Sequence, residues 1–500
     1  MSVLATLWWL SFWTALGLIL GSFLNAVIYR IPRRQSLRDP LWSACPYCHN
    51  RIAWYDNLPV VSFILLRGRC RHCSVPIATF YPVIEALMAI IVLLLLDAFM
   101  IGCVREGLSA SAVGLGERII LDWPILAAHV VLFSCLLAMS AIDIEHYWVD
   151  IRFTNLVTIF GFAMHMIWTP RHSMSWPRPW DSTAVVCIFA LVGLGVVWLV
   201  FLIWCQSEET DVQEETPSEE QSHRDEIDHS GPRRPPPSLA APPRQAAWIT
   251  VSLLVILFIL LLLRQAGDVP LRHAGRAVIP LFLIFTLVVT ASTPMRDADD
   301  EIAEAIDEER STARQMVLSE LLFLLPAALF GLTGWWLVSH GQQFAPRFST
   351  ALHTQAPSLG LSMLRNWQPF FGLATAASGF IIAGAMGWAI RIVFTLVFGK
   401  EAFGTGDIHM MAAAGCVAGW PVVLLGFILT CGLALLGWLA TLPFKRTRAL
   451  PLGPWLSISF LVVVIFFNTI LQWPVVQRVA ALGEWYFSGN SHAVFLEPGS

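Results

Sequence analysis

The chain has 500 residues, of which 31 are lysine or arginine and 35 are aspartate or glutamate, so the formal net charge is −4. Hydrophobic residues make up 56% of the sequence and charged residues 13%, which is about half the charged fraction of a typical soluble protein. This composition excludes a water-soluble globule, and the absence of a dominant basic face gives no support for nucleic-acid binding.

Long apolar stretches predict an all-α polytopic membrane protein, because a helix needs about 20 apolar residues to cross the hydrocarbon core. We expect roughly 11–12 spans, with the run at 408–419 too short to cross alone. The expected stretches are 4–28, 82–100, 122–143, 152–168, 183–205, 247–264, 277–293, 316–338, 372–398, 408–419, 421–441 and 452–473.

The first apolar run is expected to be a retained membrane helix and not a cleaved signal. It lacks a basic segment before it, and Arg30, Arg33 and Arg34 follow it in place of a small-residue cleavage site. Positive charge after a span marks the cytoplasmic side, so 30–81 should lie there. Threading the spans alternately also places 442–451, with its own basic cluster, on that side.

Four cysteines follow the first span in two C-x-x-C pairs, Cys45/Cys48 and Cys70/Cys73. Two such knuckles at this separation predict a four-thiolate structural zinc site, and a short hairpin could lie between them. The ion would replace the core that a module of about 50 residues struggles to build. Two disulfides or a redox pair are the alternatives, and the expected cytoplasmic placement argues against disulfides.

Carboxylates inside apolar runs are costly and therefore point to function. Asp143 ends a long run, and Asp407 begins another; the threading places both at the cytoplasmic edge of the membrane, at the same depth. For either aspartate alone, a helix cap or a water-facing interfacial residue is the alternative. Further acids near the spans are expected to be dipole-favoured, solvated or interfacial: Glu85, Glu145, Asp150 and Glu320.

Two aspartates that meet share a proton near neutral pH, which supplies a base to deprotonate water and an acid to protonate a leaving amine. Peptide hydrolysis is the natural chemistry of such a pair. Gly404 and Gly406 lie just before Asp407, where missing side chains permit unusual backbone angles and close approach of an extended substrate.

Two hydrophilic interruptions divide the membrane part. Residues 206–246 are acidic and then proline-rich, which predicts disorder, and 296–314 predicts a solvated acidic helix. The expected organisation is a first helix at 1–29, a zinc module at 30–81, helices with the first aspartate at 82–205, the insert at 206–246, inserted helices at 247–369, helices with the second aspartate at 370–473, and a tail at 474–500.

Taken together, these segments resemble the bacterial type IV prepilin peptidases, the leader peptidases of type IV pili and type II secretion, which are GxGD-type membrane aspartic proteases. They follow that family's order over most of 1–168 and about 370–440. The matching pieces are GSFLNAVIYRIPR at 21–33, CPYC at 45–48, CRHC at 70–73, YPVIE at 81–85, AIDIEHYWVD at 141–150 and GKEAFGTGDIHMMAAAG at 399–415.

The resemblance implies a bacterial inner-membrane enzyme that cleaves the short basic leader of type IV prepilins or pseudopilins, after a glycine and on the cytoplasmic side. It implies that Asp143 and Asp407 are the paired catalytic aspartates, and that the four cysteines form the tetracysteine domain. Many members also methylate the new amino terminus, which would add S-adenosylmethionine as a cofactor.

Three positions depart from the family pattern. His409 stands where a lysine is usual, Phe80 where an arginine is usual, and Val149 where a proline is usual. The first two put contacts with the substrate or its leader in doubt more than hydrolysis. About 200 residues also separate the two aspartate regions, far more than the family usually has there.

Two other functions fit parts of the pattern. A catalytically inert membrane assembly protein would use the zinc module to dock a partner and the carboxylates for structure. A transporter would use membrane carboxylates to relay protons, but it should carry them near mid-membrane in broken helices. The expected position at one membrane edge weakens that interpretation.

Overall fold

The computed structural model describes most of the two regions that carry the motifs, and this part of the chain is mostly helical, with two isolated β-bridges and no strand. Seven of the described helices are long and apolar enough to cross a membrane. The described residues are 3–38, 42–101, 108, 115–146, 149–168, 185–197, 199, 313–344, 368–399, 403–441, 451–474 and 476–478.

The helices follow the predicted apolar runs, because hydrocarbon requires every backbone polar group to be satisfied within the segment. The candidate spans lie in α1 (Val3–Arg30), α3 (Phe80–Leu96), α4 (Leu115–His146), α10 (Ala313–Phe344), α13 (Gln368–Phe398), α15 (Trp420–Thr441) and α16 (Leu452–Leu471). The π-helical turn η2 (Asp97–Ile101) continues α3. The shorter apolar helices are α5 (Ile151–Ile167), Val185–Val197 and α14 (Thr405–Ala418).

Some sequence predictions fall outside this part. The expected spans 247–264 and 277–293 and the insert 206–246 lie outside the described residues, as does 296–314 except for its last two residues. The 14 residues of α14 rise about 21 Å, which agrees with the prediction that this run is too short to cross alone.

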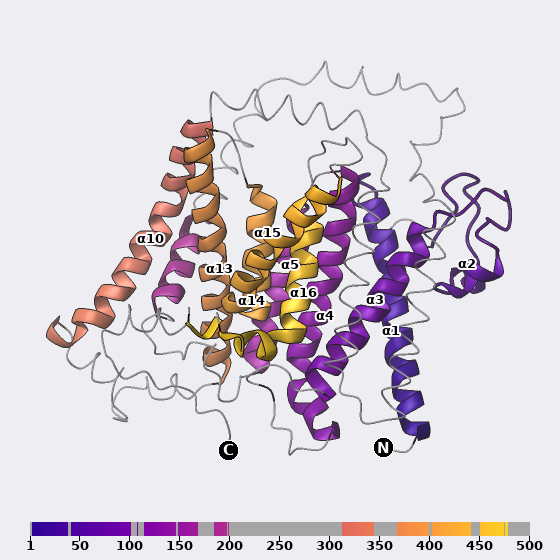
Figure 1. The fold of residues 1–500 in the computed structure, drawn as a ribbon, viewed down its shortest axis with the longest axis horizontal. Coiled ribbons are helices and arrows are strands. Elements are labelled where there is room, and N and C mark those ends of the chain that lie inside the picture. The colour runs from indigo at the N-terminus through magenta and orange to yellow at the C-terminus, as the bar shows by residue number, and fades with distance from the viewer. Residues whose placement is uncertain are drawn as a thin grey trace, which may run out of the picture.

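Neighbouring helices pack antiparallel through small residues that let their backbones approach closely. Gly17 of α1 lies against Ala89 of α3, so that an added Cβ would stand 2.5 Å from the Ala89 Cα atom. Gly379 of α13 and Gly415 of α14 are in backbone contact, and α4 runs against α16 (Figure 1). The alternating direction brings the end of α4 and the beginnings of α14 and α16 to one end of the bundle.

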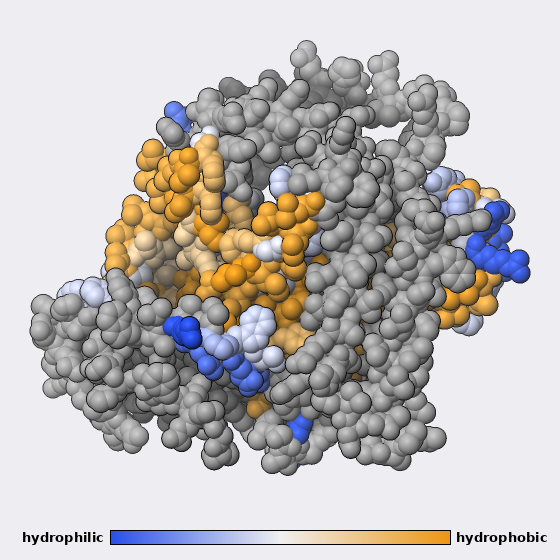
Figure 2. All heavy atoms as spheres, in the orientation of Figure 1, coloured by the Kyte–Doolittle hydropathy of each residue, from blue (hydrophilic) through white to orange (hydrophobic). Residues whose placement is uncertain are grey.

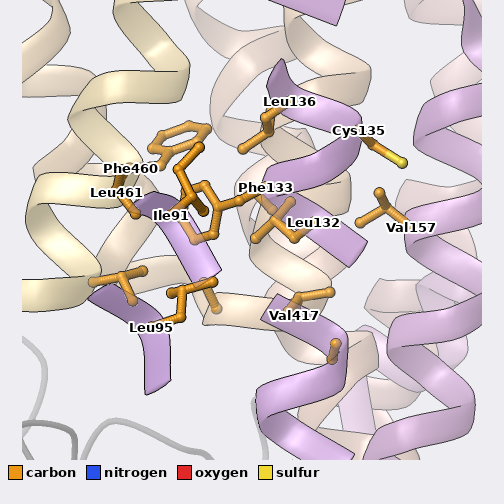
Figure 3. Close-up of a cluster of buried hydrophobic side chains, with 14 of the residues drawn as sticks. Ile91, Leu95, Leu132, Phe133, Cys135, Leu136, Val157, Val417, Phe460 and Leu461 are labelled. Atoms are coloured by element: carbon orange, nitrogen blue, oxygen red, sulfur yellow. The ribbon is translucent and has the colours of Figure 1, made fainter. Parts of the chain in front are cut away.

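The core lies where α3, α4, α14 and α16 meet. Figure 3 shows Phe133 of α4 packed among side chains that include Ile91 of α3 and Phe460 of α16. By contrast, large apolar side chains face outward from α10, α13 and α15, as the orange surface in Figure 2 shows. Leu322, Val397 and Leu436 are 65%, 68% and 59% exposed, as expected for surfaces in contact with lipid.

The cysteine-bearing segment forms a small module beside α1 and α3 (Figure 1). The interval between the two cysteine pairs has room for a short hairpin, but the chain there forms the 3-10 helix η1 (Trp54–Asn57) and the short helix α2 (Val61–Leu65). Proline at position 59 and the two helices leave no strand to pair in this interval.

Candidate zinc centre and carboxylate pair

The four cysteines of the module come together as predicted. One ligand atom from each of Cys45, Cys48, Cys70 and Cys73 lies within 4.8 Å of the others, and the Sγ atoms of Cys45 and Cys73 are 3.8 Å apart. Tetrahedral zinc with Zn–S bonds of about 2.3 Å requires sulfur atoms about 3.8 Å apart. The residues therefore fit a zinc ion, and four thiolates would leave it no open position for water.

The two cysteine pairs sit on equivalent backbone turns. In the first, the Cys45 amide donates to the Asn50 carbonyl and His49 donates back to Cys45; in the second, the Cys70 amide donates to Val75. His49 and Ser74, each directly after the second cysteine of its pair, have φ angles of 55° and 57°. This left-handed residue turns the chain sharply, so that both cysteines of a knuckle point to one place.

Local hydrogen bonds lower the pKa of two of these thiols, Cys48 and Cys70, and so favour their thiolate forms. Backbone N–H groups near Cys73 and His72 lower the pKa of Cys70 to about 7, and a backbone contact with Asn50 lowers the pKa of Cys48. Burial has the opposite effect on Cys45, raising its pKa to about 12. A metal ion would stabilise all four thiolates, because only the deprotonated sulfur binds.

The module is tied to the membrane helices through Glu85. The Oε2 atom of this buried carboxylate accepts a hydrogen bond from the Val60 amide at 2.7 Å, and Oε1 lies 3.5 Å from the Asn25 side-chain nitrogen. The expectation that Glu85 is simply a dipole-favoured helix acid is wrong. It links α3 with α1 and with the beginning of α2.

Asp143 and Asp407 lie at the same end of the bundle. Asp143 is buried near the end of α4, and Asp407 is partly exposed in the first turn of α14. Their side chains are close enough to interact electrostatically, although the residues are far apart in the chain. Two carboxyl groups at one end of the bundle could act together as a base and an acid on a water molecule between them.

The Asp143 carboxylate is held by the beginning of α16. Its Oδ2 atom accepts a hydrogen bond from the Gly453 amide at 3.1 Å, and one turn earlier Ser140 contacts Ser457 at 2.7 Å between hydroxyl oxygens. The glycine is required here, because an added Cβ would stand 2.7 Å from the same carboxylate oxygen. Sequence analysis did not identify Gly453, which no motif marks.

The two predicted glycines adopt ordinary backbone angles, so the expected unusual angles are wrong. Gly404 precedes α14 with φ −67° and ψ 143°, and Gly406 is already helical. What matters is space: a Cβ on Gly404 would stand 3.3 Å from Asp407 Oδ2, and one on Gly406 would stand 2.7 Å from the Val149 Cβ. The beginning of α14 thus packs directly against Val149, two residues before α5.

Two neighbouring acids have structural partners, which corrects their interpretation as solvated or interfacial residues. Asp150 is buried and caps α5, accepting a hydrogen bond from the Arg152 amide at 2.8 Å. Glu320 of α10 forms an ion pair with the buried Arg391 of α13 at 2.8 Å. The side chain of Glu145 is not among those described.

Arg391 is a site residue that the sequence motifs do not predict. Its Nη1 atom donates to the Phe403 carbonyl at 2.5 Å, immediately before Gly404. This arginine therefore connects α10 to the backbone that leads into Asp407. A single basic residue inside the long apolar run 372–398 was the signal that could have identified it.

The remaining positions that depart from the family pattern lie close to these elements. Phe80 begins α3, and His409 is half-buried in α14, two residues after Asp407. Their roles, like the catalytic roles of the aspartates, remain predictions.

The comparisons with known proteins support the resemblance expected from the motifs. Residues 15–99 match a family described as the bacterial peptidase A24 N-terminal domain. The chain is 35% identical over 150 residues to a prepilin leader peptidase/N-methyltransferase of Myxococcus xanthus, covering 30% of this chain and 38% of that protein. No solved structure matches.

Two further relatives carry the same name. The protein of Vibrio cholerae is 44% identical over 84 residues, covering 15% of this chain and 33% of its own length. The protein of Burkholderia pseudomallei strain 1026b is 34% identical over 220 residues, which cover 39% of this chain and 61% of its own length. The chain thus spans between one third and about three fifths of the length of these curated relatives.

Proposed function

We propose that this protein is a membrane aspartic endopeptidase that removes the short basic leader from type IV prepilin-like proteins at the cytoplasmic face of the bacterial inner membrane. The observation that carries the proposal is that Asp143 and Asp407, from two different helices, lie at the same end of the bundle and interact electrostatically. The similarity to proteins named prepilin leader peptidases supports the choice of substrate.

In the proposed reaction, one carboxylate takes a proton from water while the other, protonated carboxyl group is available to the leaving amine. The hydroxide formed attacks the scissile carbonyl carbon, and the amide C–N bond breaks as the amine receives its proton. The Gly453 amide holds Asp143 in position, while the exposed Gly404 leaves the approach to Asp407 open. An extended substrate could reach the pair from that side.

The zinc module has a structural role in this proposal. A closed four-thiolate site organises the chain around it and offers no water for activation. The names of these relatives include N-methyltransferase, and methylation of the new amino terminus is therefore a second readout of the same assay.

The test uses the purified full chain in lipid nanodiscs with a prepilin substrate. Wild-type protein should release the leader, and Asp143→Asn and Asp407→Asn should each reduce cleavage by at least about 1,000-fold, because neither carboxyl group can replace the other. Glu117→Gln, an exposed acid at the opposite end of α4, is the control and should retain full activity.

The alternative, an inert assembly protein, predicts a different result. It requires that wild-type protein bind prepilin without releasing a leader, and that the aspartate variants bind equally well. Normal cleavage by both aspartate variants would instead show that the pair is not the catalytic centre. Thermal unfolding of each variant distinguishes a lost reaction from a lost fold.

A further inference from the structure

The zinc module carries an exposed apolar edge on η1, α2 and the turn between them. These side chains are strongly exposed for residues of their type: Trp54 is 79%, Leu58 41%, Val61 48%, Ile64 61% and Leu65 73% exposed. Figure 2 shows hydrophobic surface gathered along the lower edge of the module and strongly hydrophilic surface on its outer side. A contiguous apolar edge on a module outside the spans marks a contact surface.

The module is also strongly basic. Residues 30–79 contain eight arginines and two aspartates, so a bound four-thiolate zinc site with a net charge of about −2 would still leave an excess of positive charge. The arginines are Arg30, Arg33, Arg34, Arg38, Arg51, Arg67, Arg69 and Arg71. Positive charge beside exposed aromatic and aliphatic side chains matches an anionic lipid surface.

The structure fixes the depth of this edge relative to the spans. The Val60 amide at the beginning of α2 donates to Glu85, which belongs to the candidate span α3. Val60 has φ 60° and ψ −45°, and the Val61 amide donates to the Pro59 carbonyl at 2.6 Å, which makes a tight turn that a β-branched residue rarely adopts. The contact with Glu85 holds that turn against α3.

As a result, α2 does not project away from the membrane helices. In Figure 1 it forms the lower edge of the module and stands level with the upper part of α1. Glu85 lies five residues, or about 8 Å, from the beginning of the candidate span α3, so the beginning of α2 stands near the inner edge of the headgroup layer at the end where the module lies. The apolar edge then continues the lipid-facing surface of the spans.

We propose that the apolar edge of the zinc module lies in the headgroup layer of an anionic bilayer, with its arginines in contact with lipid phosphates. A basic leader peptide is the less suitable occupant, because the arginines would repel it. The proposal concerns the module alone and does not depend on protease activity. In this proposal, the four-cysteine site holds a short apolar helix, α2, at the membrane surface.

The test places a benzophenone amino acid at Leu65 of the full chain in nanodiscs and detects lipid adducts by mass spectrometry after irradiation. A second protein carries the same group at Tyr47, in the first zinc knuckle and outside α2. We expect lipid adducts from position 65 in phosphatidylglycerol nanodiscs, several-fold more than from position 47 and several-fold more than in phosphatidylcholine.

A variant tests whether the contact with Glu85 holds α2 against the bilayer. Glu85→Leu, which removes both acceptor oxygens, should lower the adduct yield from position 65 several-fold while zinc content stays at one per chain, and Glu117→Leu should leave the yield unchanged. Absence of lipid adducts with zinc retained would overturn the proposal, as would cross-linking to an added prepilin in preference to lipid. Equal yields in the two lipids would overturn the assignment to anionic headgroups.

Discussion

At the residue scale, the Asp143 carboxylate depends on a glycine that lies more than 300 positions away in the chain. The Gly453 amide donates to it, and an added Cβ would stand 2.7 Å from its Oδ2 atom. Gly453→Ala should therefore displace the carboxylate and reduce cleavage by about 10- to 100-fold with little change in unfolding temperature. Leader release and thermal unfolding measure the two effects.

Gly432→Ala supplies the matched control, because an added Cβ there meets nothing within 4 Å. Its activity should equal that of wild type. An unchanged rate for Gly453→Ala would show that the position of Asp143 is not critical.

The contact between Gly406 and Val149 makes a second prediction at this scale. Gly406→Ala would bring two Cβ atoms to 2.7 Å, and such overpacking costs about 1–3 kcal/mol of stability. Val149→Gly removes the opposing Cβ, so the double variant should recover most of the loss in stability and cleavage. Additive effects in the double variant would contradict this packing account.

At the element scale, the ion pair between Glu320 and Arg391 joins α10 to α13 and, through the Phe403 carbonyl, to the beginning of α14. Glu320→Ala leaves a buried guanidinium without its carboxylate and should cost about 3 kcal/mol of stability. The same change should lower the catalytic rate more than the affinity for prepilin, because it loosens the backbone before Asp407.

A double-mutant cycle tests this link. Glu320→Ala and Arg391→Ala together should cost less than the sum of the single changes, with a coupling of about 1 kcal/mol or more. Glu117→Ala, which removes an exposed acid, should change stability by less than about 0.5 kcal/mol. Zero coupling would mean that the ion pair between Glu320 and Arg391 does not contribute to the packing of α10 against α13.

The zinc module gives a prediction that concerns an element as a whole. Removal of zinc by a chelator should increase amide hydrogen exchange throughout 42–79, because the ion replaces a core in this segment. Exchange in α4 and α5 should remain slow. Cys45→Ser should abolish zinc binding, whereas Cys431→Ser, at an exposed thiol on α15, should retain one zinc per chain. Slow exchange in 42–79 without zinc would contradict the structural role.

At the scale of the whole molecule, the sequence predicts the elements better than it predicts their contacts. Apolar runs locate the helices, because helix formation is the only way for a single segment to satisfy its backbone in hydrocarbon. The cysteine spacing likewise predicts the thiolate cluster. The links through Glu85, Arg391 and Gly453 could not be predicted, since each joins a side chain to a backbone group brought near it only by the fold.

The arrangement of the helices also predicts which end of the bundle faces the cytoplasm. Because the helices alternate in direction, the module, the end of α4 and the beginning of α14 share one end, and α16 ends at the other (Figure 1). The basic cluster after α1 favours the cytoplasm for the first end. The exposed Gln472, just after α16, should then face the periplasm, and the exposed Gln35 the cytoplasm.

A membrane-impermeant thiol reagent added to intact cells should therefore label Gln472→Cys above the wild-type background and leave Gln35→Cys unlabelled until the inner membrane is opened. The opposite pattern would place both aspartates outside the cytoplasm, away from precursors that still carry their leaders. Labelling of both positions in intact cells would mean that one of the helices between them does not cross. Either outcome would remove the basis for proteolysis at the cytoplasmic face, even if the carboxylate pair and the zinc knuckles are as described.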